Sequence, residues 1–322
     1  MNILVTGCAG FIGFHTVKFF LDKSKMQIIG IDNLNNYYDV KLKKERLKNL
    51  KKKNFIFING DIKDKKKLEK IFKSNNIKYV IHLAAQAGVR YSINNPQTYF
   101  DNNILGFFNI IDLSKKYKIK HFIYASSSSV YGDSINFPLD ETENTDRPLS
   151  FYAASKKCNE VMAYSYSNIY GLRSTGLRFF TVYGPMGRPD MSLYKFTDSI
   201  FRSKKIQLYN YGNHIRDFTY IDDITVAIFK LINRPPKQKV PHSIYNVGSD
   251  NPKSLKYYLK IIEKNCNKDA KVGYLGLQKG DVHKTHAGID QLRSYIDYHP
   301  KTKIENGIKY FVKWYKKNLN IK

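Results

Sequence analysis

A tyrosine and a lysine four positions apart, Tyr152 and Lys156, are the side chains in this sequence best suited to moving a proton. On a helix, residues i and i+4 lie on the same face. Because an ammonium beside a phenol favours the phenolate, we expect Lys156 to lower the pKa of Tyr152 and Tyr152 to act as a general base. The chain holds 25 tyrosines, so a chance surface pair is the alternative, and the surrounding elements must decide between the two.

A glycine-rich segment near the N-terminus has the residues needed to bind a pyrophosphate. The sequence TGCAGFIG (6–13) follows an apolar run and opens an amphipathic stretch, which is the strand, turn and helix order of dinucleotide sites. Gly7 permits a tight turn, Gly10 lets backbone N–H groups approach phosphate, and Gly13 allows close packing of helix on strand. Asp32 ends the second apolar run, where a carboxylate accepts bonds from the ribose hydroxyls and repels a 2′-phosphate. The segment predicts a site for NAD rather than NADP; a glycine turn that only joins strand to helix is the alternative.

Short apolar runs alternate with amphipathic stretches through the first half of the chain, which is typical of a parallel sheet with crossover helices. The expected strands cover residues 3–5, 28–31, 55–58, 79–83, 122–125 and 174–178. The expected helices include residues 12–21, 39–50 and 97–117. This order predicts an α/β fold with a doubly wound, Rossmann-type parallel sheet, whose ligands bind at the carboxyl ends of the strands.

The alternation breaks after about residue 180, where glycine and proline recur from Gly184 to Pro189. Smaller strand and helix units follow. We therefore expect two domains, an NAD-binding Rossmann domain of residues 1–180 and a smaller α/β domain of residues 181–322, to which the family resemblance described below assigns the binding of a nucleotide sugar. No low-complexity linker separates them, which indicates a shared interface.

Composition excludes several other classes of protein. The chain of 322 residues is 42% hydrophobic, enough for a full core. No apolar run approaches the roughly 18 residues needed to cross a bilayer, and Met1 leads into the first apolar run without the features of a secretory signal. The three cysteines are scattered, so we expect no disulfide framework, no cysteine-based metal site and a cytoplasmic location.

The formal net charge of +27 is the one feature that points toward a nucleic-acid partner. Only ten of the 54 basic residues are Arg, however, and most of the lysines lie in polar stretches such as residues 41–53, 63–73 and 313–317. We interpret them as solvated surface positions and expect no nucleic-acid partner and no membrane partner. A basic surface would still steer an anionic substrate toward the protein.

The Gly-x-x-Gly-x-x-Gly spacing, followed by the Tyr-x-x-x-Lys pair, resembles the extended short-chain dehydrogenase/reductase family. Further matches follow in the family's order along the chain. The resemblance implies an NAD-dependent enzyme in which Tyr152, Lys156 and Ser127 are catalytic. The cofactor contacts that it implies are Gly7, Gly10, Phe11, Ile12, Gly13, Asp32, Asn33, Asp61, Ile62, Leu83, Ala84, Ala85, Asn102, Tyr152 and Lys156.

Serines stand where relatives of this type carry catalytic carboxylates. Ser127, Ser128 and Ser129 precede a Val-Tyr-Gly triplet. In the resemblance, Ser127 is the hydroxyl that bonds the reacting sugar oxygen. Sugar-nucleotide 4,6-dehydratases carry an Asp–Glu pair just before the triplet, and UDP-glucuronate decarboxylases carry a Glu in the last of these positions. Because this chain has no carboxylate there, the resemblance favours an epimerase.

Longer segments are similar to the UDP-glucuronate 4-epimerases. They are AAQAGVRYS (84–92), ASSSSVYG (125–132), LRFFTVYGP (177–185), GRPDM (187–191), RDFTYIDDI (216–224) and QKGDV (278–282). The resemblance implies interconversion of UDP-glucuronate and UDP-galacturonate through a 4-keto intermediate, with transient reduction of bound NAD. The substrate contacts that it implies are Arg90, Ser127, Ser128, Thr181, Arg188, Tyr209, Arg216 and Asp281.

An acid sugar places a special demand on such a site. The C6 carboxylate of the 4-keto intermediate lies beta to the ketone, and a β-keto acid loses CO₂ when its C5–C6 bond aligns with the carbonyl π system. Donors such as Thr181 and Arg188 could hold the carboxylate away from that alignment. For Arg188, a loop ion pair with Asp190 is the alternative.

Other functions stay open on the sequence alone. The nearest is a 4-epimerase for UDP-glucose or UDP-N-acetylglucosamine, and a more distant one is a non-catalytic protein that binds NAD or nucleic acid. The resemblance also implies a homodimer that pairs through the segments 97–117 and 151–170. We expect no metal site.

Overall fold

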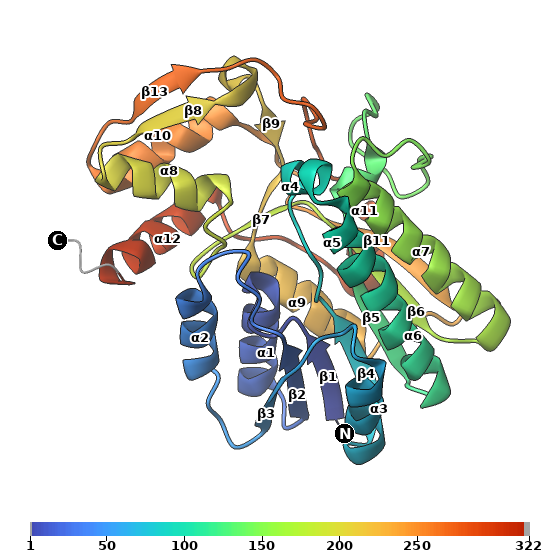
Figure 1. Ribbon diagram of the computed structural model, residues 1–322. Coiled ribbons are helices and arrows are strands. Elements are labelled where there is room, and N and C mark those ends of the chain that lie inside the picture. The colour runs from blue at the N-terminus through green and yellow to red at the C-terminus, as the bar shows by residue number, and fades with distance from the viewer. Residues whose placement is uncertain (1, 319–322) are drawn as a thin grey trace.

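In the computed structural model, which describes residues 2–318, a seven-stranded parallel sheet lies between two layers of helices (Figure 1). The strand order is β11-β6-β5-β4-β1-β2-β3, so the winding reverses beside β1 and the predicted doubly wound α/β fold is confirmed. The strands of this main sheet are β1 (Asn2–Thr6), β2 (Gln27–Asp32), β3 (Phe55–Asn59), β4 (Ile77–His82), β5 (His121–Ser127), β6 (Ser174–Phe179) and β11 (His242–Val247).

Alternate residues of the central strands pack into two separate cores, which is why these strands are almost continuously apolar. In β1, Ile3 and Val5 belong to one core and Leu4 to the other. None of the helices within residues 2–318 is long and apolar enough to cross a membrane. The helices that flank the sheet are α1 (Phe11–Lys23), α2 (Val40–Lys48), α3 (Lys65–Ser74), α6 (Gly106–Lys116), α7 (Phe151–Tyr170) and α9 (Ile221–Ile232).

The single helix expected over residues 97–117 is instead three segments. After α4 (Val89–Asn94) come α5 (Pro96–Tyr99), a π-helical segment (Phe100–Leu105) and then α6. The Asn103 side chain in the π segment accepts a bond from Gln86 N at 2.8 Å and donates to Gln86 O at 3.0 Å. The helix widens where this amide reaches the loop after β4, as π-helical turns often do at functional sites.

The second half of the chain forms small two-stranded sheets and also completes the main sheet. After β6, the chain returns through α9 to β11, which pairs with β6 at the edge of the main sheet. The other pairs are β7 with β10, β8 with β13 and β9 with β12. These elements and their helices are β7 (Thr181–Tyr183), α8 (Ser192–Phe201), β8 (Lys205–Leu208), β9 (Ile215–Arg216), β10 (Phe218–Tyr220), β12 (Lys253–Ser254), α10 (Leu255–Cys266), β13 (Lys271–Tyr274), α11 (Asp290–Ile296) and α12 (Ile304–Asn318).

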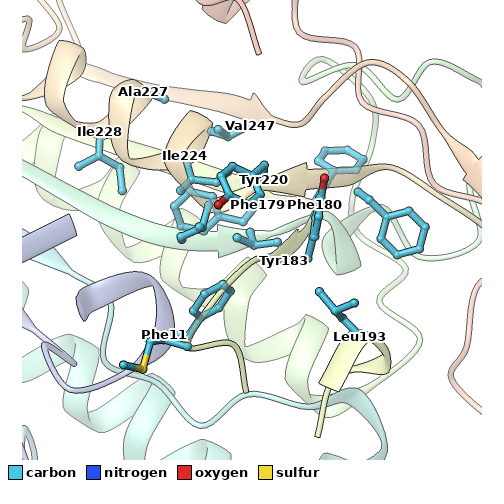
Figure 2. Packing of buried hydrophobic residues seen from close by; sticks show 14 of the residues in the cluster. Phe11, Phe179, Phe180, Tyr183, Leu193, Tyr220, Ile224, Ala227, Ile228 and Val247 are labelled. Atoms are coloured by element: carbon cyan, nitrogen blue, oxygen red, sulfur yellow. The ribbon is translucent and has the colours of Figure 1, made fainter. Parts of the chain in front are cut away.

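The two halves of the chain are joined by a continuous hydrophobic core. Figure 2 shows Phe11, Tyr183 and Leu193, from α1, β7 and α8, in the same buried cluster as Ile224 and Val247. Because protein cores are packed as densely as organic crystals, such a cluster resists relative movement of the elements that share it.

A buried ion pair fastens α7 to the main sheet. Arg178 Nε and Nη2 donate to the two carboxylate oxygens of Glu160, each at 2.9 Å, and Ser126 Oγ donates to the first of them at 2.6 Å. The Glu160 and Arg178 side chains are each only 3% exposed. The guanidinium also lies 4.7 Å from the ring centroid of Tyr131. The pair therefore ties α7 to β5 and β6 close to the carboxyl ends of both strands.

Replacing Glu160→Gln should reduce the free energy of unfolding by about 3–5 kcal/mol, because the buried guanidinium of Arg178 loses its charge partner. Urea denaturation followed by circular dichroism measures the change. Glu69→Gln is the matched control, since Glu69 pairs with Lys116 on the surface and its loss should barely move the midpoint. Equal effects of the two substitutions would contradict this prediction.

Candidate active site

A cavity of about 990 Å³ lies at the carboxyl ends of the main-sheet strands and is closed on its other side by the second half of the chain. Ligands of doubly wound sheets bind at this edge. All but one of the site residues expected from the sequence line it. They are Gly7, Gly10, Phe11, Ile12, Gly13, Asp32, Asn33, Ile62, Leu83, Ala84, Ala85, Arg90, Asn102, Ser127, Ser128, Tyr152, Lys156, Thr181, Arg188, Tyr209, Arg216 and Asp281.

The glycine turn between β1 and α1 leaves no room for side chains. Gly7 has a φ of +71°, and its N–H donates to Ile31 O at 2.8 Å. A Cβ atom on Gly7 would lie 2.8 Å from Ala84 N, and one on Gly13 would lie 2.0 Å from Gly7 O. The turn therefore exposes bare backbone at the N-terminus of α1, where the helix dipole favours a phosphate. This cradle fits the pyrophosphate of a dinucleotide.

The carboxylate of Asp32 is held at the end of β2 by backbone groups. It accepts bonds from Ala9 N at 3.1 Å and Leu34 N at 2.9 Å. This orientation keeps its negative charge at the cavity wall, where ribose hydroxyls are favoured and a 2′-phosphate is repelled.

Asp61 is the exception among the expected cofactor contacts, because it is not among the residues that line the cavity. Its carboxylate instead accepts bonds from the Asn33 amide at 3.0 Å and from Lys63 N at 2.8 Å. Asp61 thus orients Asn33, which does face the cavity. A carboxylate at the end of a strand accepts hydrogen bonds from donors of the adjoining loops. The sequence does not show which of these donors will lie close to it, so it could not predict that Asp61 turns away from the cavity.

Helix α7 places Tyr152 and Lys156 at the cavity. Ser150 caps the helix by accepting a bond from Ala153 N at 3.1 Å, so Tyr152 falls in the first turn. Lys156 Nζ donates to Ala125 O of β5 at 2.9 Å. Both side chains line the cavity beside the end of β5, as the i, i+4 spacing indicated.

The expected lowering of the Tyr152 pKa by Lys156 is wrong for the protein by itself. Burial raises the pKa of Tyr152, and this outweighs the nearby Ser127 hydroxyl and the charge of Arg188, which both lower it. Burial also lowers the pKa of Lys156 to about 8, opposed by the charge of Glu160. The ammonium donates to the Ala125 carbonyl, and burial is the largest influence on the pKa of both groups.

The serine segment continues from β5 into a short 3₁₀ turn (Ser128–Tyr131). Ser127 Oγ accepts a bond from Ser129 N at 3.1 Å and donates to Ser129 Oγ at 3.2 Å. All three hydroxyl residues line the cavity, and Ser129 adds to the contacts expected from the sequence. This side of the site offers hydroxyls rather than carboxylates.

Arg90 spans the two sides of the cavity. One of its Nη atoms donates to the Asp281 carboxylate at 2.6 Å, and its guanidinium lies 3.8 Å from the ring centroid of Tyr209. These three expected substrate residues thus form one cluster, in which Arg90 comes from α4 and the other two from the second half of the chain. An arginine stacked on an aromatic ring keeps its donors pointing along the ring plane.

Arg216 is partly buried in the same wall and is bonded mainly to backbone. It donates to the carbonyls of Ile215, Val282 and His283 at 2.6 to 2.9 Å. Burial lowers its pKa to about 10, opposed by the charge of Asp281. A guanidinium that has lost part of its hydration is stabilised by an anionic ligand group. Arg216 is therefore suited to bind such a group.

Arg188 is paired with Asp190, which was the alternative that the sequence left open for it. Arg188 Nε donates to Asp190 Oδ1 at 2.9 Å, a second bond joins Arg188 Nη2 to Asp190 Oδ2, and Tyr37 donates its hydroxyl to Asp190 Oδ2 at 3.3 Å. Arg188 nevertheless lines the cavity and lies close enough to Tyr152 to lower its pKa. Arg188 therefore both forms the ion pair with Asp190 and faces the cavity.

Sequence reasoning missed several other residues that line the cavity. They include Tyr37, Lys43, Gln86, Asp190 and His214. Asp190 stands in the GRPDM segment, so its neighbour Arg188 was a signal for it. Tyr37 and Lys43 lie between β2 and the middle of α2, where the polar sequence gives no sign of facing inward.

The doubly wound sheet and the bare glycine turn at its switch point define a dinucleotide-binding protein. A comparison with protein families gives a match over residues 3–248 to the NAD dependent epimerase/dehydratase family. The chain belongs to this family, whose cofactor is NAD.

Individual relatives match along almost the whole chain. "Protein CapI" of Staphylococcus aureus is 47% identical, with 98% of each chain covered. A "UDP-glucuronate 4-epimerase" of Thermodesulfobacterium geofontis is 43% identical, with 99% of this chain and 97% of the relative covered. Among solved structures, UDP-glucuronic acid 4-epimerase from Bacillus cereus, in complex with UDP-glucuronic acid and NAD, superposes with a TM-score of 0.93 at 31% identity, covering 99% of this chain and all of that one.

Substituting Gly13→Ala should destabilise the protein by about 1–3 kcal/mol and abolish binding of NAD, because the new methyl group would collide with Gly7 O. Thermal unfolding and the nucleotide content of the purified protein measure both effects. Gly276→Ala is the control, since nothing lies within 4 Å of a Cβ atom there. Retention of NAD by Gly13→Ala would contradict this prediction, because it would show that the turn accommodates a Cβ atom at this position.

Proposed function

We propose that this chain is an NAD-dependent UDP-glucuronate 4-epimerase, which interconverts UDP-glucuronate and UDP-galacturonate. The observation that carries the proposal is the guanidinium of Arg188 in the same cavity as Tyr152 and Lys156. A cation beside the proton-transfer residue suits a sugar whose C6 is a carboxylate. Relatives named as UDP-glucuronate 4-epimerases support it over the full length of the chain.

Tyr152 is proposed to move the proton of the sugar 4-hydroxyl. When bound, NAD accepts a hydride from C4, returns it to the opposite face, and adds a positive charge that favours the phenolate of the tyrosine. Tyr152 Oη receives the hydroxyl proton and gives it back after the 4-keto sugar has turned in the site. Ser127 bonds the reacting oxygen, and Lys156, anchored on Ala125 O, adds a cation to the same cavity.

Arg188, Thr181 and the serine hydroxyls are proposed to keep the carboxylate on the substrate. The 4-keto sugar loses CO₂ only when its C5–C6 bond aligns with the ketone π system. Donors on both sides of the carboxylate hold that bond near the carbonyl plane, and the planar guanidinium offers two parallel N–H groups for this purpose. Hydroxyls at positions 127–129 provide no general base to remove the C5 proton.

The remaining site residues divide between two ligands. We assign the cofactor to the walls from the first half of the chain, residues 1–180, and the nucleotide sugar mainly to residues 181–322, with Arg90 and the serines reaching across. In this assignment Arg216 contacts the diphosphate, while Arg90, Tyr209 and Asp281 contact the rest of the nucleotide. Residues 221–247 belong to the second half in sequence, but they supply helix α9 and the edge strand β11 of the main sheet.

Incubation of the purified protein with UDP-glucuronate should yield UDP-galacturonate without added NAD, as chromatography of the nucleotide sugars would show. Tyr152→Phe should lower kcat by about 10²- to 10⁴-fold, the range contributed by a general base, while leaving the unfolding temperature in place. Tyr164→Phe, on the exposed part of the same helix, should retain activity.

Parallel assays with UDP-glucose and UDP-N-acetylglucosamine separate the proposed substrate from its neutral rivals. A UDP-glucose 4-epimerase from Thermotoga maritima also superposes on this chain, with a TM-score of 0.89 at 30% identity, 99% of this chain and all of that one being covered. Turnover of a neutral sugar but not of UDP-glucuronate would overturn the choice of substrate. Full activity of Tyr152→Phe would overturn the mechanism.

We further propose that the protein is a homodimer that pairs through the π segment, α6 and α7. These elements lie side by side on one side of the molecule (Figure 1). They expose large apolar side chains, among them Val161 at 58% and Ile169 at 64% of their surface. Apolar patches of this kind on one face mark association sites. The others are Phe100, Leu105, Phe108, Phe151, Tyr164 and Tyr170.

Val161→Glu should convert the dimer to a monomer, because the charge would be buried without a partner in the interface. Sedimentation velocity measures the change in mass. Ile135→Glu is the control, since Ile135 is 86% exposed and lies outside these helices. A native protein that sediments as a monomer would refute the dimer.

The cytoplasm is the proposed location of the reaction. The three cysteines, Cys8, Cys158 and Cys266, are all free thiols. Free thiols persist in a reducing compartment.

A further inference from the structure

The guanidinium of Arg188 already has a carboxylate partner within the protein, the side chain of Asp190. The two side chains meet in a fork of two parallel hydrogen bonds, and they are 21% and 24% exposed for Arg188 and Asp190 respectively. Burial works against the charge of Arg188, but the carboxylate more than compensates and raises its pKa. Within residues 2–318, Asp190 is the only side chain that accepts a hydrogen bond from this guanidinium.

Epimerisation requires the substrate carboxylate to leave the guanidinium of Arg188 while the sugar ring turns. Hydride must return to the opposite face of C4, so the 4-keto sugar has to turn over within the cavity. The carboxylate is carried on the neighbouring carbon and swings with the ring. If it were the only partner of Arg188, each turn would leave a largely buried guanidinium without a countercharge, which is disfavoured.

We propose that Asp190 is a positioning residue that exchanges with the substrate carboxylate on Arg188, so that the guanidinium always has one carboxylate partner while the 4-keto sugar turns. The inference rests on the proposed function, because only an acid sugar carries the competing group. Asp190 weakens the hold on the substrate and in return makes rotation faster. Its effect is therefore opposite on binding and on turnover.

Tyr37 provides a second anchor for Asp190 during the exchange. Its hydroxyl donates to Asp190 Oδ2, and its ring packs edge-on against Tyr91 at 5.0 Å between centroids. A Cβ atom on Gly88 would lie 2.7 Å from the Tyr37 hydroxyl, so the glycine makes room for it. Because Tyr37 comes from the loop after β2, it can hold Asp190 at the cavity wall when Arg188 turns to the substrate.

The test is Asp190→Asn, which preserves shape but removes the competing charge. The dissociation constant of UDP-glucuronate, measured by calorimetry, should fall about tenfold and kcat should fall about tenfold, the size of coupling within one salt-bridge network. The fraction of reduced nicotinamide during turnover should rise, because the keto sugar leaves its first orientation slowly. Binding of UDP, which has no carboxylate, should be unchanged.

Two further variants keep the proposal open to refutation. Asp190→Glu should restore turnover toward that of the native protein, since it returns a carboxylate. In an Arg188→Ala background, Asp190→Asn should have no additional effect on binding, because the guanidinium for which the two carboxylates compete is absent. Asp190→Ser replaces Asp190→Asn if the latter does not fold.

The outcomes separate this inference from the proposed function. Failure of the native protein to convert UDP-glucuronate would remove the proposed function itself. If the native protein converts UDP-glucuronate but Asp190→Asn binds it equally well or more weakly, the proposed exchange is wrong. Asp190 would then be a structural residue. Equal loss of UDP and UDP-glucuronate binding would lead to the same conclusion.

Discussion

The position of α7 against the ends of β5 and β6 determines where Tyr152 and Lys156 lie in the cavity, and the buried pair of Glu160 and Arg178 holds the helix there. Lys156 lies one turn before Glu160 on the same helix and donates to the β5 carbonyl of Ala125. Tyr152 lies one turn earlier again, at the cavity. A small rotation of α7 would carry both side chains away from the serine segment, so an interaction outside the cavity determines the geometry within it.

Burial of charge is the second common theme of the site. Arg188, Arg216 and Lys156 line one cavity, and burial by itself lowers the pKa of each. Carbonyls satisfy Arg216 and Lys156, and a carboxylate satisfies Arg188. A nucleotide sugar with a diphosphate and a carboxylate is the kind of ligand that matches such a wall. The basic surface of the whole protein would raise the rate at which that anion arrives.

The same framework serves relatives with different named substrates, and the variable part is small. The solved structures include a UDP-glucose 4-epimerase and UDP-glucuronic acid 4-epimerases on one fold. In this chain the glycine turn fits the pyrophosphate of the cofactor, and Tyr152 and Lys156 line the cavity beside the end of β5. Arg188 and Asp190 lie on the irregular connection that follows β7, where a change of side chain costs the fold little.

Features that depend on neighbours in the chain could be predicted from the sequence. The glycine turn, the alternating strands and helices, and the i, i+4 pair on α7 all follow from local backbone geometry and periodicity. The resemblance extended this to residues of the cavity wall that lie far apart in the chain, among them Thr181, Arg188 and Tyr209.

Features that depend on partners distant in the chain were decided only by the tertiary structure. It turned Asp61 toward Asn33, widened the helix at Asn103, and joined Asp190 to Tyr37. It also reversed the expected shift in the pKa of Tyr152, because desolvation sums over every atom that surrounds the phenol. Spacing along the chain records which residues are available to react, but the dielectric and the hydrogen-bond partners around them exist only once the distant segments have packed together.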